Sequence, residues 1–128
     1  MTALTNGLGE GSDIIKHGAY YYLLLSTGSC CAGLQSTYHV GVGRSQKLTG
    51  PYLTKDNTRL LDGAITTLLP GDSNHPGQGG QSVYMENGQH YLVYHAYTAP
   101  SGDPVINVRP LFFDNSAWPT VDACQAAP

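Results

Sequence analysis

Residues 15–23 read Ile-Lys-His-Gly-Ala-Tyr-Tyr-Tyr-Leu, a short strand signal that turns at Gly18 and returns as a strand rich in tyrosine and leucine. Residues 84–92, Tyr-Met-Glu-Asn-Gly-Gln-His-Tyr-Leu, echo this order, with Gly88 in the place of Gly18 and Tyr91 in that of Tyr21. A unit of strands and tight turns that returns after about 70 residues suggests successive blades of a β-propeller.

Strand signals continue along the rest of the chain. They are enriched in Tyr, Val, Ile and Leu, and Gly, Pro, Asn and Asp form turns between them. The expected strands are 13–16, 20–26, 37–43, 64–69, 81–86, 90–97 and 105–113. No segment of ten or more residues has a 3.6-residue apolar period, so the sequence predicts an all-β chain. A β-sandwich fits this spacing equally well, and two repeats are too few to close a propeller ring.

Length and composition narrow the class of protein. A chain of 128 residues is one domain or a piece of one. No apolar run approaches the roughly 20 residues that span a bilayer, so we expect a soluble globular chain without a membrane partner. The net charge of -3 and six scattered Lys and Arg residues argue against nucleic acid as a partner.

Three cysteines are present, and two of them, Cys30 and Cys31, are adjacent. An odd number with this spacing provides neither a disulfide framework nor a zinc site. Adjacent Cα atoms lie about 3.8 Å apart, below the usual disulfide range, so a bond between these two cysteines would be a strained ring in a tight turn. We therefore expect two free thiols packed beside a turn.

Glu10 is the acidic residue with the most unusual surroundings, since it lies between Gly9 and Gly11 just before an expected strand. Backbone without bulky side chains lets a substrate approach a carboxylate closely, although a solvated loop glutamate fits the same pattern. Residues 75–81, His-Pro-Gly-Gln-Gly-Gly-Gln, suggest a loop that brings backbone close to a ligand or to the molecular axis. His39 and His95 stand beside tyrosines in strands, where a histidine bonded within the core is more common than a ligand or a base.

Residues 10–23, Glu-Gly-Ser-Asp-Ile-Ile-Lys-His-Gly-Ala-Tyr-Tyr-Tyr-Leu, resemble the segment Glu-(Ala/Gly)-Pro-x-Ile-x-Lys-x-x-Gly-x-Tyr-Tyr-Leu of the family 43 arabinanases. The resemblance continues, in order, through the Cys-Cys-Ala-Gly and Ser-Thr-Tyr-His-Val-Gly-Val-Gly-Arg-Ser segments to the Trp-Pro pair. It covers nearly the whole chain, from Glu10 to Pro119. An ordered set of motifs is far more specific than any one of them.

The resemblance implies a five-bladed propeller that hydrolyses α-1,5-linked arabinan, or a related plant polysaccharide, with inversion. In that family the leading glutamate is the general acid, which makes Glu10 the candidate here. An aspartate base and a second aspartate that adjusts the pKa of the acid both lie upstream of the glutamate. The resemblance thus implies that residues 1–128 are a C-terminal fragment of the catalytic domain, roughly its last two to three blades. The missing N-terminal blades would then be its partner.

Two departures from the family pattern affect the site. Ser12 stands where the family usually has proline, and Gly80 stands where a family histidine helps to hold a metal ion. The resemblance implies a calcium or other metal ion near the axis of the full domain, but no metal ligand can be assigned in this chain. We assign Gln81, His95, Cys30 and Cys31 to contact with a polysaccharide or oligosaccharide substrate.

The first ten residues lack the positive and apolar regions of a signal peptide, so this sequence as it stands predicts no export. The resemblance implies that the full-length protein is secreted. Two other hypotheses compete with an enzyme fragment. One is a non-catalytic carbohydrate-binding or interaction module, and the other is an open set of blades that does not fold alone, because edge strands and apolar faces are exposed.

Overall fold

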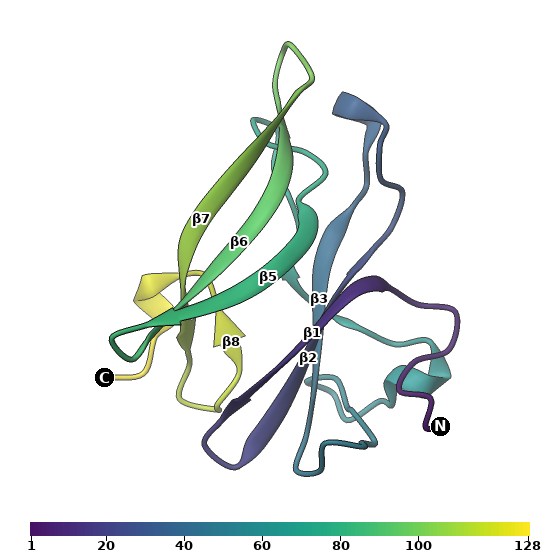
Figure 1. Ribbon diagram of the computed structural model, residues 1–128, viewed down its shortest axis with the longest axis vertical. Coiled ribbons are helices and arrows are strands. Elements are labelled where there is room, and N and C mark those ends of the chain that lie inside the picture. Colours follow the sequence, from purple (N-terminus) through teal and green to yellow (C-terminus); the bar gives the residue numbers. More distant parts are fainter.

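The computed structural model describes all of residues 1–128 as two four-stranded antiparallel sheets (Figure 1). The first sheet consists of β1 (Glu10–His17), β2 (Tyr20–Thr27), β3 (His39–Ser45) and β4 (Thr66–Leu69), and the second of β5 (Gly79–Glu86), β6 (Gln89–Thr98), β7 (Asp103–Phe113) and β8 (Pro119–Thr120). Three 3-10 turns, Gly33–Gln35, Leu60–Asp62 and Ala123–Gln125, are the only helical elements. None of them has the length and hydrophobicity to cross a membrane. The all-β prediction is confirmed.

Each sheet is a meander in which every strand pairs with the next one along the chain. Both sheets begin with the predicted hairpin, where Lys16 faces Tyr21 across the first turn and Met85 faces His90 across the second. Gly18 and Gly88 have positive φ angles of 58° and 79° in these turns, which glycine adopts without steric cost. The repeat in the sequence therefore corresponds to two equivalent blades.

An apolar cluster of 11 buried residues holds the two blades together. Tyr22 and Leu24 contribute to it from the first sheet, and Leu92 and Tyr94 from the second. Because side chains alternate across a strand, the residues between them point the other way. Leu23 therefore belongs to a second cluster, under the connection between β3 and β4.

The outer face of the second sheet is not packed against another part of the chain. Ile106 and Val108 on β7 are 72% and 63% exposed, and Tyr84 on β5 is 58% exposed. Apolar side chains are thus exposed on this face, whereas the hypothesis that the chain does not fold alone stays a prediction.

Some strand limits differ from the predicted ones. The first strand begins at Glu10 rather than at residue 13, because a bulge between Glu10 and Asp13 interrupts the alternating pattern. The strand expected at 64–69 begins only at Thr66, and that expected at 37–43 is shifted to His39–Ser45. Strand β8 was not predicted, since two residues carry no period.

The expectation of two free thiols is wrong, since Cys30 and Cys31 form a disulfide with a Cα–Cα distance of 3.8 Å. Cys31 has a positive φ of 64°. Both cysteines are exposed, and Cys124 is a free exposed thiol.

Candidate active site

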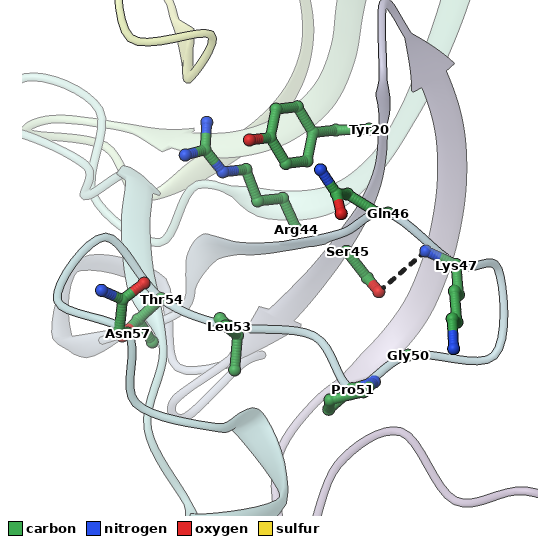
Figure 2. Close-up of a pocket in the computed structure, with 10 residues that line it drawn as sticks. All are labelled: Tyr20, Arg44, Ser45, Gln46, Lys47, Gly50, Pro51, Leu53, Thr54 and Asn57. Carbon is green, nitrogen blue, oxygen red and sulfur yellow. Dashed lines mark hydrogen bonds between the residues drawn. The ribbon is translucent and has the colours of Figure 1, made fainter.

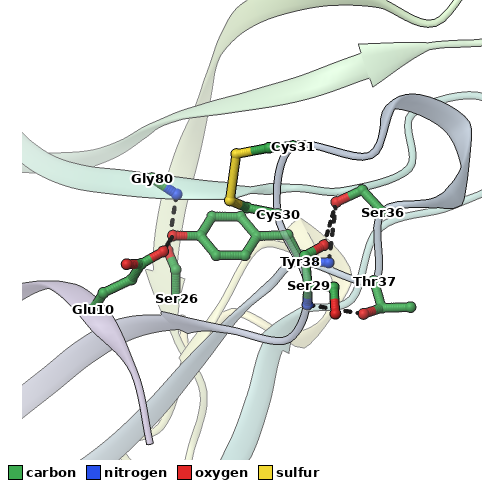
Figure 3. Close-up of a disulfide and its surroundings, with 9 residues drawn as sticks. All are labelled: Glu10, Ser26, Ser29, Cys30, Cys31, Ser36, Thr37, Tyr38 and Gly80. Carbon is green, nitrogen blue, oxygen red and sulfur yellow. Dashed lines mark hydrogen bonds between the residues drawn. A yellow bond between two sulfur atoms is a disulfide. The ribbon is translucent and has the colours of Figure 1, made fainter.

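Glu10 is the first residue of β1 and lies opposite Ser26 of β2. A bulge at the next two residues separates it from the regular pairing, which resumes at Asp13. Bulges commonly re-aim a side chain out of the plane of the sheet. The side chain of Glu10 is exposed, and its Oε1 accepts a hydrogen bond from the Tyr38 hydroxyl at 2.7 Å (Figure 3).

Tyr38, which sequence reasoning missed, is a buried residue just before β3 and only 6% exposed. Its ring packs against the backbone of Gly79, where a Cβ atom would lie 2.0 Å from the ring. Burial, with the Glu10 carboxylate adding to it, raises the pKa of the Tyr38 hydroxyl above its usual value. The hydroxyl therefore stays protonated and available as a donor to Glu10.

Gln81 lies beside the same site and is 5% exposed. Its Nε2 donates to the carbonyl of Gly11 at 2.6 Å, and its Oε1 accepts from the Ser26 hydroxyl at 2.5 Å. The same hydroxyl accepts from the backbone N–H of Gly80 at 2.8 Å. Both polar ends of the Gln81 side chain are thus already bonded within the protein.

His95 is a half-buried residue of β6 and pairs across the sheet with Gly79. Its ring lies edge-on to Tyr97, with centroids 4.9 Å apart, and 6.3 Å from the ring of Tyr38. His39 makes a local hydrogen bond of 3.0 Å to the Thr37 carbonyl. The structure thus places His95, but not His39, in the aromatic cluster that supports Tyr38.

The disulfide lies on the loop after β2 and shares its surroundings with Tyr38 and Ser36 (Figure 3). Ser36 fastens this loop, because its hydroxyl donates to the carbonyl of Ser29 at 2.7 Å. The predicted site residues therefore fall around one tyrosine, with Glu10 bonded to it, His95 packed near it and the two cysteines on the adjoining loop.

A polar cavity of about 290 Å³ opens beside Glu10. Seven residues line it, namely Gly7, Gly9, Glu10, Ser26, Thr27, Gly28 and Tyr38. Glycines leave room for a close approach, and hydroxyls can bond to the hydroxyls of a sugar. Glu10 is the only carboxyl group in this lining.

A second cavity, of about 330 Å³, contains none of the predicted site residues (Figure 2). Arg44 on its wall lies between two aromatic rings, 4.1 Å from the centroid of Tyr20 and 4.4 Å from that of Trp118. Its Nη1 donates to the carbonyls of Ser116 at 2.7 Å and Ala117 at 3.1 Å. Arg44 thereby connects β3 to the turn between β7 and β8, which is a structural role.

The residues present do not supply a metal site. No group of three or more His, Cys, Asp or Glu side chains is placed to hold a metal ion. Gly80, at the position of the family histidine, is exposed and has no side chain with which to coordinate.

Two meander sheets packed as propeller blades, with an exposed carboxylate at a polar cavity beside the first of them, are the architecture of a β-propeller glycosidase. The comparison with protein families agrees, since the sequence model for glycosyl hydrolases family 43 matches residues 2–118. The chain belongs to this family.

Curated relatives are arabinan-degrading enzymes. The chain is 40% identical over 114 residues to an extracellular exo-α-(1→5)-L-arabinofuranosidase of Cellvibrio japonicus, covering 88% of this chain and 33% of that protein. It is 38% identical over 112 residues to an extracellular endo-α-(1→5)-L-arabinanase of Bacillus subtilis, covering 87% and 33%. The chain therefore spans about a third of the length of these relatives.

Solved structures show the same relationship. The α-L-arabinanase of Cellvibrio cellulosa in complex with arabinohexaose superposes with a TM-score of 0.85 at 36% identity, covering 94% of this chain and 40% of that one. An endo-arabinanase of Bacillus licheniformis gives a TM-score of 0.85 at 34% identity, covering 93% and 42%. These neighbours are propellers, and the two sheets are part of such a propeller rather than a β-sandwich.

Proposed function

We propose that this chain provides the general acid, Glu10, of a glycoside hydrolase that cleaves α-1,5-linked arabinan with inversion. The observation that carries the proposal is an exposed carboxylate, fixed on one oxygen by Tyr38 at 2.7 Å, on the wall of a glycine-lined polar cavity. The arabinan-degrading enzymes among the relatives support the choice of substrate.

The hydrogen bond from Tyr38 gives the two carboxylate oxygens of Glu10 different roles. Because Oε1 accepts the hydroxyl proton of Tyr38, a proton on the carboxyl group belongs on Oε2. In the proposed reaction, Oε2 gives this proton to the departing glycosidic oxygen as the bond to the sugar breaks.

Inversion needs a second carboxylate about 6.5 to 9.5 Å from the acid, with a water between it and the sugar. The acid must also be kept protonated near neutral pH, which burial and a neighbouring negative charge achieve. No second carboxyl group lines the cavity beside Glu10. We therefore assign the base and the pKa-adjusting aspartate to blades that the relatives possess beyond this third, and expect no turnover by residues 1–128 alone.

On this proposal, residues 1–128 form the C-terminal part of a catalytic propeller and meet the polysaccharide only together with the other blades. We also propose that the full-length protein is secreted. Two relatives are named extracellular enzymes, and the exposed Cys30–Cys31 disulfide fits an oxidising compartment.

The proposal can be tested in a hybrid enzyme in which this chain replaces the matching third of the Bacillus subtilis relative. The hybrid should hydrolyse linear arabinan, and ¹H NMR should detect the inverted anomer first. Glu10→Gln should lower kcat on arabinan about 10² to 10⁴-fold. The loss should be far smaller on an aryl arabinofuranoside with an activated leaving group, which departs without a proton.

Glu86→Gln is the matched control, because Glu86 is exposed at the end of β5 and should leave both activities unchanged. Full activity of the Glu10→Gln hybrid on linear arabinan would refute the acid role. If the chain alone binds arabino-oligosaccharides equally well with and without Glu10→Gln, while the hybrid is inactive, a non-catalytic binding module is the better description.

A further inference from the structure

We infer that Gln81 is a positioning residue for Glu10, which it serves by joining two β-bulges that face each other across the two blades. The inference rests on the proposed function of Glu10 as the acid. It assigns Gln81 a role different from the substrate contact expected from the sequence.

The two bulges occupy equivalent places in the two sheets. In the first blade, the register shifts between Glu10 and Asp13, and in the second it shifts between Gly79 and Ser82. Backbone groups in a bulge are released from the regular ladder. The carbonyl of Gly11 is therefore free to accept a hydrogen bond from outside its own sheet.

Gln81 supplies that hydrogen bond, and its neighbours fix the orientation of its amide. The Ser26 hydroxyl has one proton, which it donates to Oε1 of Gln81 at 2.5 Å while accepting from the Gly80 N–H at 2.8 Å. The amide nitrogen of Gln81 then has the Gly11 carbonyl as its partner, at 2.6 Å.

A second hydrogen bond joins the same two strands just beyond the bulges. Oδ2 of Asp13 accepts from the backbone N–H of Val83 at 2.8 Å. The segment between Glu10 and Asp13 is thus attached to β5 at two points, and the peptide between Gly11 and Ser12 cannot rotate without breaking the bond from Gln81.

This attachment matters because Gly11 offers no resistance of its own. It has a φ of 58°, and nothing lies within 4 Å of where its Cβ would be. Glycine has the most conformational freedom of all residues, so without the hydrogen bond from Gln81 rotation at Gly11 would displace the Glu10 side chain. Tyr38 holds the carboxylate of Glu10, and Gln81 holds the carbonyl of the next residue.

Direct contact with substrate is a poorer role for Gln81. Its side chain is buried, and each polar atom already has a protein partner at 2.6 Å or less. A sugar hydroxyl could bond to this amide only by displacing Ser26 or the Gly11 carbonyl, at the cost of an unpaired buried group.

The test uses the hybrid enzyme described above with Gln81→Met, which keeps the length of the side chain and removes both hydrogen bonds. A displacement of about 1 Å at a reacting group can cost about 10²-fold in rate. We expect kcat on linear arabinan to fall about 10 to 10²-fold. On the activated aryl arabinofuranoside, kcat should fall less than about threefold. The KM of both substrates should stay unchanged.

Equal losses on the two substrates would overturn the inference, because general structural damage does not depend on the leaving group. A raised KM with kcat retained would also overturn it, in favour of substrate contact. Should Gln81→Met fail to fold by near-ultraviolet circular dichroism, Ser26→Ala removes the group that orients the amide. Because Ser26 also lines the cavity, this variant decides by the dependence of the loss in kcat on the leaving group alone.

Glu10→Gln in the same hybrid separates this inference from the proposed function. If Glu10→Gln shows no dependence on the leaving group, the acid role itself fails. If Glu10→Gln shows it and Gln81→Met does not, only the positioning role of Gln81 is refuted.

Discussion

Replacing Gly79 with alanine should destabilise the chain through the ring of Tyr38. The new Cβ atom would lie 2.0 Å from Cδ2 and 2.2 Å from Cε2 of that ring. Carbon atoms in contact are about 3.5 to 4.0 Å apart, so the ring must move by about 1.5 Å. Tyr38 is only 6% exposed and has little room for such a movement.

Three contributions determine the size of the effect. Forcing one methyl group into a packed site costs about 1 to 3 kcal/mol. Losing the hydrogen bond from Tyr38 to exposed Glu10 adds about 0.5 kcal/mol, the low end for such bonds. Gly79 lies outside the left-handed region, so alanine instead regains about 0.4 to 1 kcal/mol by restricting the unfolded chain. The free energy of unfolding should therefore fall by about 0.5 to 3 kcal/mol.

A double-mutant cycle measured by urea unfolding isolates the contact with the ring. In a Tyr38→Ala background the clash is gone, so Gly79→Ala should be neutral or stabilising by up to about 1 kcal/mol. The same destabilisation in both backgrounds would mean that Gly79 is needed for some reason other than the approach of Tyr38.

Three further predictions concern parts of the molecule outside the site. Burial lowers the pKa of His90 from its usual 6.5, so the folded state favours the neutral ring. The free energy of unfolding should therefore be highest above about pH 6.5 and fall as the pH drops below that value. In His90→Gln, the urea midpoint should depend less on pH between about pH 7.5 and 5. Arg44→Ala should lower the free energy of unfolding, measured in the same urea assay, by about 2 to 3 kcal/mol, because hydrogen bonds and ring contacts are lost. Arg44→Lys should recover less than half of this loss. Iodoacetamide should label one cysteine, Cys124, in the native chain and three after reduction, as counted by intact mass; three labels without reductant would contradict the disulfide.

The fold was largely predictable because its signals are local. Hairpins with Gly18 and Gly88 in their turns, followed by alternating apolar residues, define both blades before any long-range contact is considered. The bulges were not predictable in this way. Gly11 and Gly80 indicate flexible backbone, but only the strand pairing shows that each lies in an interrupted ladder.

The site was predictable in part for a related reason. Glu10 could be selected from its motif, whereas Tyr38 precedes its strand by one residue and looks like an ordinary core aromatic. Its role depends on a hydroxyl that reaches Glu10, 28 residues away in the sequence. Gln81 could be singled out from its loop, but the direction of its amide depends on Ser26 of the other sheet.

The facing bulges make the geometry around Glu10 a property of the pair of blades rather than of either one. Gly11 belongs to β1 and Gln81 to β5, so exchanging one blade between homologous proteins would separate two partners that have to match. Recombination or directed evolution of such propellers should therefore tolerate crossovers after β8 or before β1 more readily than crossovers within the connection from β4 to β5.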